Sequence, residues 1–289
     1  MSQAGAPVGG LLVLIDPVAR RLDGESVRIA KDVLSAGAAA KICLPDSQEE
    51  FARALARRGH RRPVVVGDDR ALVRAVGLLH REWGERGDVG DLGDLGDLGG
   101  DRPEAVVSLV PVGPAGALGL ARSLGVPQSA VLAARAALDG VSYPRDLLVD
   151  DGDGVVLGGL SIGPAPRTVP VTRWGGTYRS LLRTLLPSPA APPGRRVHRL
   201  RVEVDGVVLA DVEHPVEDVA VRTSGVGGPA EVVVRLAGAA PLTGCAEAIT
   251  VSGASGADFR YRADHALAGP VRRRTWTVRR AAWSLTLPR

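Results

Sequence analysis

The chain has 289 residues, of which 45% are hydrophobic and 24% are charged, with a formal net charge of +4. This composition excludes a wholly disordered chain, a collagen-like repeat and a coiled coil, and the length predicts one large domain or two of medium size. The charge is low for a dedicated nucleic-acid-binding protein, so we expect no nucleic-acid partner, whereas a nucleotide or an anionic membrane surface would suit it. Two isolated cysteines without metal-site spacing favour a reduced, cytoplasmic setting, and no apolar run is long enough to span a bilayer.

The first half of the chain alternates strand and helix patterns. Strands are predicted at residues 11–15, 41–44, 63–66 and 105–110, and helices at 27–37, 51–59, 72–79, 118–124 and 129–138. The spacing of Asp46 and Glu49 predicts a capping box at the start of the second helix. Repeated strand–helix units of this kind predict a doubly wound α/β domain over residues 1–146.

The second half, residues 147–289, has a different pattern. The turn sequence Asp-Asp-Gly-Asp-Gly predicts a hairpin over residues 147–157, followed by a helix at 173–186 and a proline-rich linker at 187–194. Short strands are predicted at 200–204, 207–212, 219–222, 231–236, 248–251, 259–263, 275–278 and 283–287. Regular short strands predict an antiparallel β-sandwich or barrel.

A fourfold Gly-Asp-Val/Leu repeat at residues 87–98 interrupts the first half. Glycine at every third place disfavours both helix and strand, so we expect an inserted surface loop. A calcium site is the weaker interpretation, because the aspartates lack the spacing of known calcium loops.

Ligands of open α/β sheets bind beyond the carboxyl ends of the strands, so the turns at those ends are the candidate sites. Asp16 follows the first strand, the sequence Gly67-Asp68-Asp69-Arg70 follows the third, and a turn with Gly113 and Gly116 follows the fourth. Glycine lets a phosphate approach the backbone, and carboxylates can hold Mg²⁺. The alternative, that these glycines only make tight turns, stays open. Neither a Walker A sequence nor a Rossmann fingerprint nor a nucleophile elbow is present.

The order of these turns resembles the diacylglycerol kinase catalytic family, bacterial lipid kinases related to sphingosine kinases and, more distantly, NAD kinases. Asp16-Pro17 stands where that family has Asn-Pro. Gly67 and Asp68 match the second Gly and the Asp of its GGDGT signature. Further matches are Pro111, Gly113, the stretch Ala121-Arg-Ser-Leu-Gly-Val-Pro127, Asp146, and Asp264 as the Asp of a C-terminal DGE.

The resemblance implies an ATP-binding α/β domain followed by a β-sandwich, with the active site in the cleft between them. It also implies phosphoryl transfer from ATP to a diacylglycerol-like lipid alcohol, with Mg²⁺. Asp264 would then be the general base. The residues implied to bind the nucleotide are Asp16, Gly67, Asp68, Arg70, Gly113 and Gly116, and those implied to bind the metal are Asp68 and Asp146.

Several departures from the family favour an alternative, a catalytically inactive pseudokinase that binds nucleotide, lipid or a protein partner. Asp69 adds negative charge where phosphates should lie, Pro114 removes a backbone donor, and no Glu follows Asp264. Arg70 would offset the charge of Asp69 or replace a lost donor. Both interpretations require the Gly113 turn to lie against Gly67 and Asp68. A Rossmann-type oxidoreductase is disfavoured by the β-rich second half.

The C-terminal region suggests peripheral contact with an anionic membrane. Eight arginines lie between residues 258 and 289, interspersed with Trp276 and Trp283, and this combination suits a lipid headgroup region. The alternative is an ordinary strand pair with the tryptophans facing the core, since Trp276 and Val278 alternate to the same side. A homodimer is left open.

Overall fold

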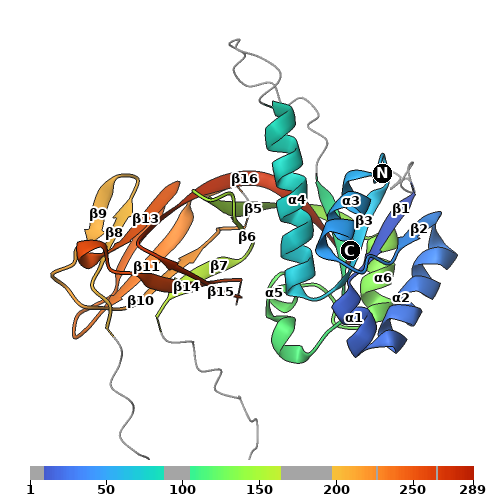
Figure 1. The fold of residues 1–289 in the computed structure, drawn as a ribbon, viewed down its shortest axis with the longest axis horizontal. Coiled ribbons are helices and arrows are strands. Elements are labelled where there is room, and N and C mark those ends of the chain that lie inside the picture. The colour runs from blue at the N-terminus through green and yellow to red at the C-terminus, as the bar shows by residue number, and fades with distance from the viewer. Residues whose placement is uncertain (1–9, 88–104, 164–196, 226, 265) are drawn as a thin grey trace, which may run out of the picture.

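A long mixed β-sheet runs through the part of the chain that the structure, a computed structural model, describes: residues 10–87, 105–163, 197–225, 227–264 and 266–289. Within these ranges the sheet has ten strands, and a second, antiparallel sheet has six. The predicted combination of an α/β half and an antiparallel sandwich half is confirmed (Figure 1).

The α/β half is built on four parallel strands in the order β2, β1, β3, β4. Their bounds are β1 Leu11–Ile15, β2 Ala40–Cys43, β3 Arg62–Gly67 and β4 Val106–Pro111. One face packs against α1 (Pro17–Leu22), α2 (Gly24–Gly37) and α6 (Ala130–Asp139). The other face packs against α3 (Gln48–Ala56), α4 (Asp69–Gly87) and α5 (Gly119–Ser123), with the short 3₁₀ turn η1 (Ala115–Ala117) before α5. Strands covered on both faces explain the continuous apolar runs of β1 and β3.

The sandwich half places the six-stranded sheet against the far end of the ten-stranded sheet. The six-stranded sheet has the order β12 (Leu242–Ala246), β11 (Ala230–Leu236), β10 (Val216–Arg222), β7 (Gly159–Ile162), β14 (Phe259–Ala263) and β15 (Ala266–Val271). Opposite it lie β5 (Val141–Asp150), β6 (Val155–Val156), β8 (Leu200–Val204), β9 (Val207–Ala210), β13 (Ala248–Gly253) and β16 (Arg273–Leu287). Valines, with Trp276 and Phe259, fill the core between the two sheets.

β16 joins the two halves. Its first part pairs with β13 in the sandwich, and its last residues pair in parallel with β4 of the α/β half. Figure 1 shows this strand passing from one half to the other. β5 follows β16 along both parts, so this strand runs across the domain boundary predicted at residue 146.

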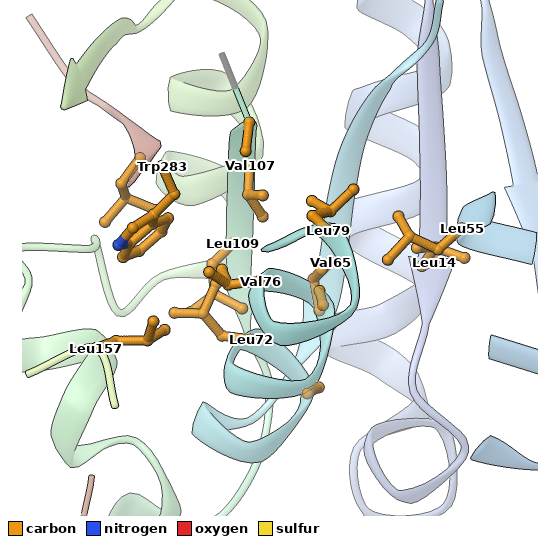
Figure 2. Close-up of a cluster of buried hydrophobic side chains, with 14 of the residues drawn as sticks. Leu14, Leu55, Val65, Leu72, Val76, Leu79, Val107, Leu109, Leu157 and Trp283 are labelled. Atoms are coloured by element: carbon orange, nitrogen blue, oxygen red, sulfur yellow. The ribbon is translucent and has the colours of Figure 1, made fainter. Parts of the chain in front are cut away.

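One core cluster also spans both halves. Leu72 and Val76 of α4 pack in the same cluster as Leu157, which follows β6, and Trp283 of β16 (Figure 2). Apolar packing of this kind fixes α4 against the segment after β6.

The sequence left open whether the two C-terminal tryptophans face a membrane or the core, and the structure places both in the core. Trp276 and Trp283 are fully buried. Neither tryptophan ring can therefore insert into a membrane surface. Membrane contact stays a prediction that rests on the arginines alone. No helix in the described ranges has the length and apolar content that crossing a bilayer requires.

Several local expectations need correction. The N-cap residue of α3 is Ser47 and not Asp46, and its hydroxyl accepts from the nitrogen of Glu50. The Glu50 carboxylate accepts from the nitrogen of Asp46, so the predicted reciprocal capping box between Asp46 and Glu49 is not formed. The two last predicted strands form the single strand β16, and β7, β12 and β15 were not predicted. The predicted helix at 173–186, the linker at 187–194 and nearly all of the 87–98 repeat lie outside the described residues.

Candidate functional site

The turns that follow β3 and β4 meet at one edge of the parallel sheet, as the sequence predicts. The backbone nitrogen of Val112 donates to the carbonyl oxygen of Gly67 at 2.9 Å. A Cβ atom placed on Gly113 would lie 3.3 Å from the Cβ atom of Asp68. The Gly113 turn therefore lies against both Gly67 and Asp68, at the edge where ligands of this sheet type bind.

Two aspartates at this edge cap helices. Asp16 precedes α1, and its Oδ1 atom accepts from the nitrogen of Val18 at 2.8 Å, while its Oδ2 atom lies 3.1 Å from a guanidinium nitrogen of Arg74. Asp68 precedes α4, and its Oδ1 atom accepts from the nitrogen of Ala71 at 3.1 Å. Both carboxylates satisfy amides that a helix start leaves without an intrahelical partner.

Asp69 binds the start of a different helix. Its side chain is buried, and its two oxygens accept from the nitrogens of Leu120 and Ala121 in α5, at 2.7 and 2.8 Å. These short hydrogen bonds from backbone amides to a charged group are of the strong kind. Asp69 thus fastens α5 to the start of α4.

The starts of α1, α4 and α5 are therefore each occupied by a carboxylate of the chain itself. Helix starts attract anions because their amides and dipoles are positive there. A phosphate approaching this edge would meet amides that are already bonded, and three negative charges. Asp16 is also paired with Arg74.

Packing explains the glycine at position 67. A Cβ atom on Gly67 would lie 2.8 Å from the Cβ atom of Ala71 and 2.9 Å from that of Asp16, closer than such atoms approach. Gly116, by contrast, is exposed in η1 with no atom within 4 Å of such a position. Gly67 is thus required for the close approach of β1, β3 and α4, whereas packing does not require Gly116.

Asp264 ties the end of β14 to the segment that precedes β7. Its Oδ2 atom accepts from the nitrogen of Leu157 at 2.7 Å, and its Oδ1 atom accepts from Gly158 at 2.7 Å and Gly159 at 3.2 Å. Asp264 itself adopts φ 46°, a left-handed conformation that aspartate tolerates better than most residues. The residue implied to be the general base therefore already accepts three amide hydrogen bonds.

The implied metal pair, Asp68 and Asp146, is not formed. Asp146 lies in β5, where its Oδ1 atom accepts from the nitrogens of Gly227 and Ala281, at the irregularity in β16 between residues 279 and 283. This irregularity lies next to the start of β4, because Ser284 of β16 pairs with Val106, the first residue of β4. Asp68 lies next to the other end of β4, because the residue before it, Gly67, pairs with Pro111, the last residue of β4.

The length of β4 separates the two carboxylates by roughly 16 Å, at about 3.3 Å per residue. In the described residues, no three histidine, cysteine, aspartate or glutamate side chains gather closely enough to hold a metal ion. The acidic side chains implied to hold Mg²⁺ therefore do not fit it, and Asp146 instead stabilises the irregular turn of β16.

A cavity of about 340 Å³ lies between α4 and the sandwich half. Its wall on the α/β side comes from α4, and its other walls come from the β5–β6 hairpin and from β14 and β15. The lining residues are Asp69, Arg70, Val73, Arg74, Asp150, Gly154, Val155, Val156, Tyr261, Ala263, Asp264, Ala266 and Ala268. The volume is at the lower end of the range for small-molecule sites.

Of the site residues predicted from the sequence, Arg70 and Asp264 line this cavity. Asp69, which departs from the family signature, lines it as well. Asp16, Gly67, Asp68, Gly113, Gly116 and Asp146 do not. Arg70 is exposed, whereas Arg74 is partly covered, with its guanidinium 5.6 Å from the centre of the Phe51 ring. The structure thus moves the candidate site from the strand ends to the cavity beside them.

Sequence reasoning missed Tyr261 and Asp150, which line the cavity on the sandwich side. The Tyr261 hydroxyl lies 3.4 Å from the Oδ2 atom of Asp150, and its ring meets that of Trp276 edge-on, with centroids 5.1 Å apart. Burial, and then the charge of Asp150, raise the pKa of Tyr261. Asp150 belongs to the Asp-Asp-Gly-Asp-Gly turn, which marked a hairpin but gave no sign that it faced a cavity.

No protein-family model and no curated protein matches this sequence. Solved structures do match along nearly the whole chain. One described as "a putative diacylglycerol kinase from Bacillus anthracis str. Sterne" has 14% identity and a TM-score of 0.68, covering 99% of this chain and 98% of its own. A second so described has 15% identity and a TM-score of 0.66, with coverage of 96% and 97%. A third, of "diacylglycerol kinases" from the same organism, has 13% identity and a TM-score of 0.64, with coverage of 96% and 97%. The fold is therefore the one that these structures share.

Proposed function

We propose that this chain, which has the diacylglycerol kinase-like fold, is a ligand-binding protein that does not transfer a phosphoryl group. The observation that carries the proposal is the filling of the starts of α1, α4 and α5 by Asp16, Asp68 and Asp69. Phosphoryl transfer depends on positioning the phosphates and neutralising their charge. Three carboxylates at this edge act against both requirements.

Two further observations support the proposal. Asp146 lies at the opposite end of β4 from Asp68, so the metal pair that the resemblance implies is missing. Asp264 accepts three backbone hydrogen bonds, so its carboxylate already has a structural role in holding residues 157–159. What the fold retains is the cavity between its two halves.

The second candidate is the ATP-dependent lipid kinase, acting on a diacylglycerol-like lipid hydroxyl. The observation in its favour is that Asp264 lines the cavity, close to α4 and on the side where the resemblance would seat a lipid substrate. It would need ATP and Mg²⁺ to displace bonded carboxylates at the edge of the sheet.

A pair of assays separates the two candidates. Thermal unfolding is followed with Mg-ATP up to millimolar concentration, since a ligand that binds the folded state raises the unfolding temperature. Labelled ATP is then incubated with the protein and dioleoylglycerol in mixed micelles, beside a diacylglycerol kinase of established activity. We expect neither a saturable shift nor label in the lipid above the protein-free blank. Label transfer that Asp264→Asn abolishes, in a protein that still folds, would establish the kinase instead.

A further inference from the structure

We propose that the cavity between α4 and the sandwich half binds an amphiphile with one anionic group, and that Arg70 pairs with this group. The inference rests on the proposed function, because a kinase of this fold would seat a neutral lipid alcohol beside a nucleotide. It names the class of ligand that the cavity binds, and it makes Arg70 the residue that distinguishes anionic ligands from others.

Most of the cavity wall is apolar. The residues without a polar side chain are Val73 of α4, Gly154, Val155 and Val156 of the hairpin, and Ala263, Ala266 and Ala268 of β14 and β15. Small and branched aliphatic side chains leave space for a chain of methylene groups, whose transfer from water to an apolar surface is favourable. The apolar part of a ligand would therefore lie along β14, β15 and the hairpin.

The acidic side chains of the lining are already bonded to backbone amides. Asp69 accepts from two amides of α5, and Asp264 accepts from three amides of residues 157–159, none of which belongs to the lining. The Oδ1 atom of Asp150 accepts from the nitrogens of Gly152 and Gly154. These three carboxylates hold the walls of the cavity together through bonds to the backbone.

The two arginines of the lining differ in the same respect. Arg74 forms an ion pair with Asp16, and its guanidinium lies over the Phe51 ring, so its charge is compensated within the α/β half. Arg70 is exposed at the cavity and has no carboxylate partner among the described residues. A guanidinium in that position binds a carboxylate or a phosphate through two parallel hydrogen bonds. Arg70 is therefore the group that selects an anion.

The test measures binding of single-chain probes by calorimetry, below their micelle-forming concentrations. Dodecanoate and dodecyl phosphate present the two possible anions, dodecyltrimethylammonium presents a cation on the same chain, and inorganic phosphate and acetate present the anions without a chain. We expect saturable binding of one or both dodecyl anions, and their ratio distinguishes carboxylate from phosphate. Equal binding of the dodecyl cation, or of the anions without a chain, would overturn the inference.

Variants then assign the role to Arg70. Arg70→Glu should weaken binding of the dodecyl anions by about tenfold or more, the effect of losing about 1.4 kcal/mol of interaction. Arg21→Glu is the matched control, since Arg21 is an exposed arginine of α1 outside the lining, and it should bind like the wild type. Ala266→Phe, which adds bulk to the apolar wall, should weaken binding as well. An Arg70→Glu protein with an unchanged unfolding temperature and unchanged anion affinity would refute the assignment.

The outcomes separate this inference from the proposed function. Anion binding without label transfer in the kinase assay supports both. Label transfer together with anion binding overturns the proposed function only. Absence of both anion binding and label transfer overturns the ligand class and leaves the chain a non-catalytic member of its fold.

Discussion

The Oδ2 atom of Asp69 lies 2.7 Å from the backbone nitrogen of Leu120, which is 51 residues further along the chain. Through this contact the start of α4 holds the start of α5, and α5 in turn abuts the second half. A Cβ atom on Gly158 would lie 2.9 Å from a methyl group of Leu120 and 3.3 Å from an oxygen of Asp264. Asp69 and Asp264 thus fasten the two sides of one contact, α5 and the segment after β6.

Asp69→Asn should lower the free energy of unfolding by about 2–4 kcal/mol. Both oxygens of Asp69 accept amide hydrogen bonds in a buried place, and the Asn side chain would turn its NH₂ group toward one of those amides. Urea unfolding measures the change. Asp139→Asn, at an exposed position, is the control and should stay within about 0.5 kcal/mol of the wild type. A similarly small effect of Asp69→Asn would show that its carboxylate does not hold α5.

Asp264→Asn should loosen the segment from Leu157 to Gly159. The substitution keeps the size of the side chain and the left-handed backbone that Asn tolerates, but removes charge from an acceptor of three amide hydrogen bonds. Hydrogen exchange of peptides covering these residues should become faster, while peptides from β1 and β3 keep their protection. Unchanged exchange at residues 157–159 would argue that Asp264 is not primarily a structural residue.

Gly67→Ala and Gly116→Ala should have opposite outcomes, although the resemblance implies a nucleotide contact for both. The added methyl group at position 67 meets Ala71 and Asp16 at less than 3 Å, so we expect a loss of stability of about 1–3 kcal/mol. At position 116 it meets nothing, so stability should stay the same or rise by about 0.5–1 kcal/mol. Thermal unfolding of the two proteins tests this contrast, and equal effects would contradict the packing explanation.

His80 should make the protein less stable in mild acid. Burial, and then the charge of Arg279, lower the pKa of His80 below its ordinary value of 6.5, while Asp153 acts in the opposite direction. The unfolded chain therefore binds a proton on His80 more readily than the folded one, and folding loses stability as the pH falls through about 6.5. The unfolding temperature should drop less between about pH 7.5 and about pH 5.5 in His80→Gln than in the wild type. Parallel pH profiles for the two proteins would exclude this role.

The sequence predicted the strands and helices of the α/β half because their apolar periodicity is strong and local. It also predicted that the Gly113 turn would meet Gly67 and Asp68, since strand ends of a parallel sheet share an edge. It could not predict the partners of Asp69 and Asp264, because these are amides 51 and about 106 residues away whose positions depend on the assembled fold.

The missed elements have local causes. β15 contains Gly269 and Pro270, which read as a turn, and β7 has only four residues. The segments at 275–278 and 283–287 were separated by Arg279-Arg280-Ala281, which forms an irregular stretch inside one strand. The resemblance implied a cleft between the two halves, but most of the residues that line the cavity could not be predicted, because its walls come from three segments that are distant in sequence.

β16 also bears on how the molecule comes apart. Because its first part lies between β5 and β13 and its last part between β4 and β5, each half of the protein needs this one strand to complete its sheet. Detaching it would break hydrogen bonds and uncover core residues in both halves at once. The two halves should therefore melt as a single cooperative unit, with one calorimetric transition rather than two.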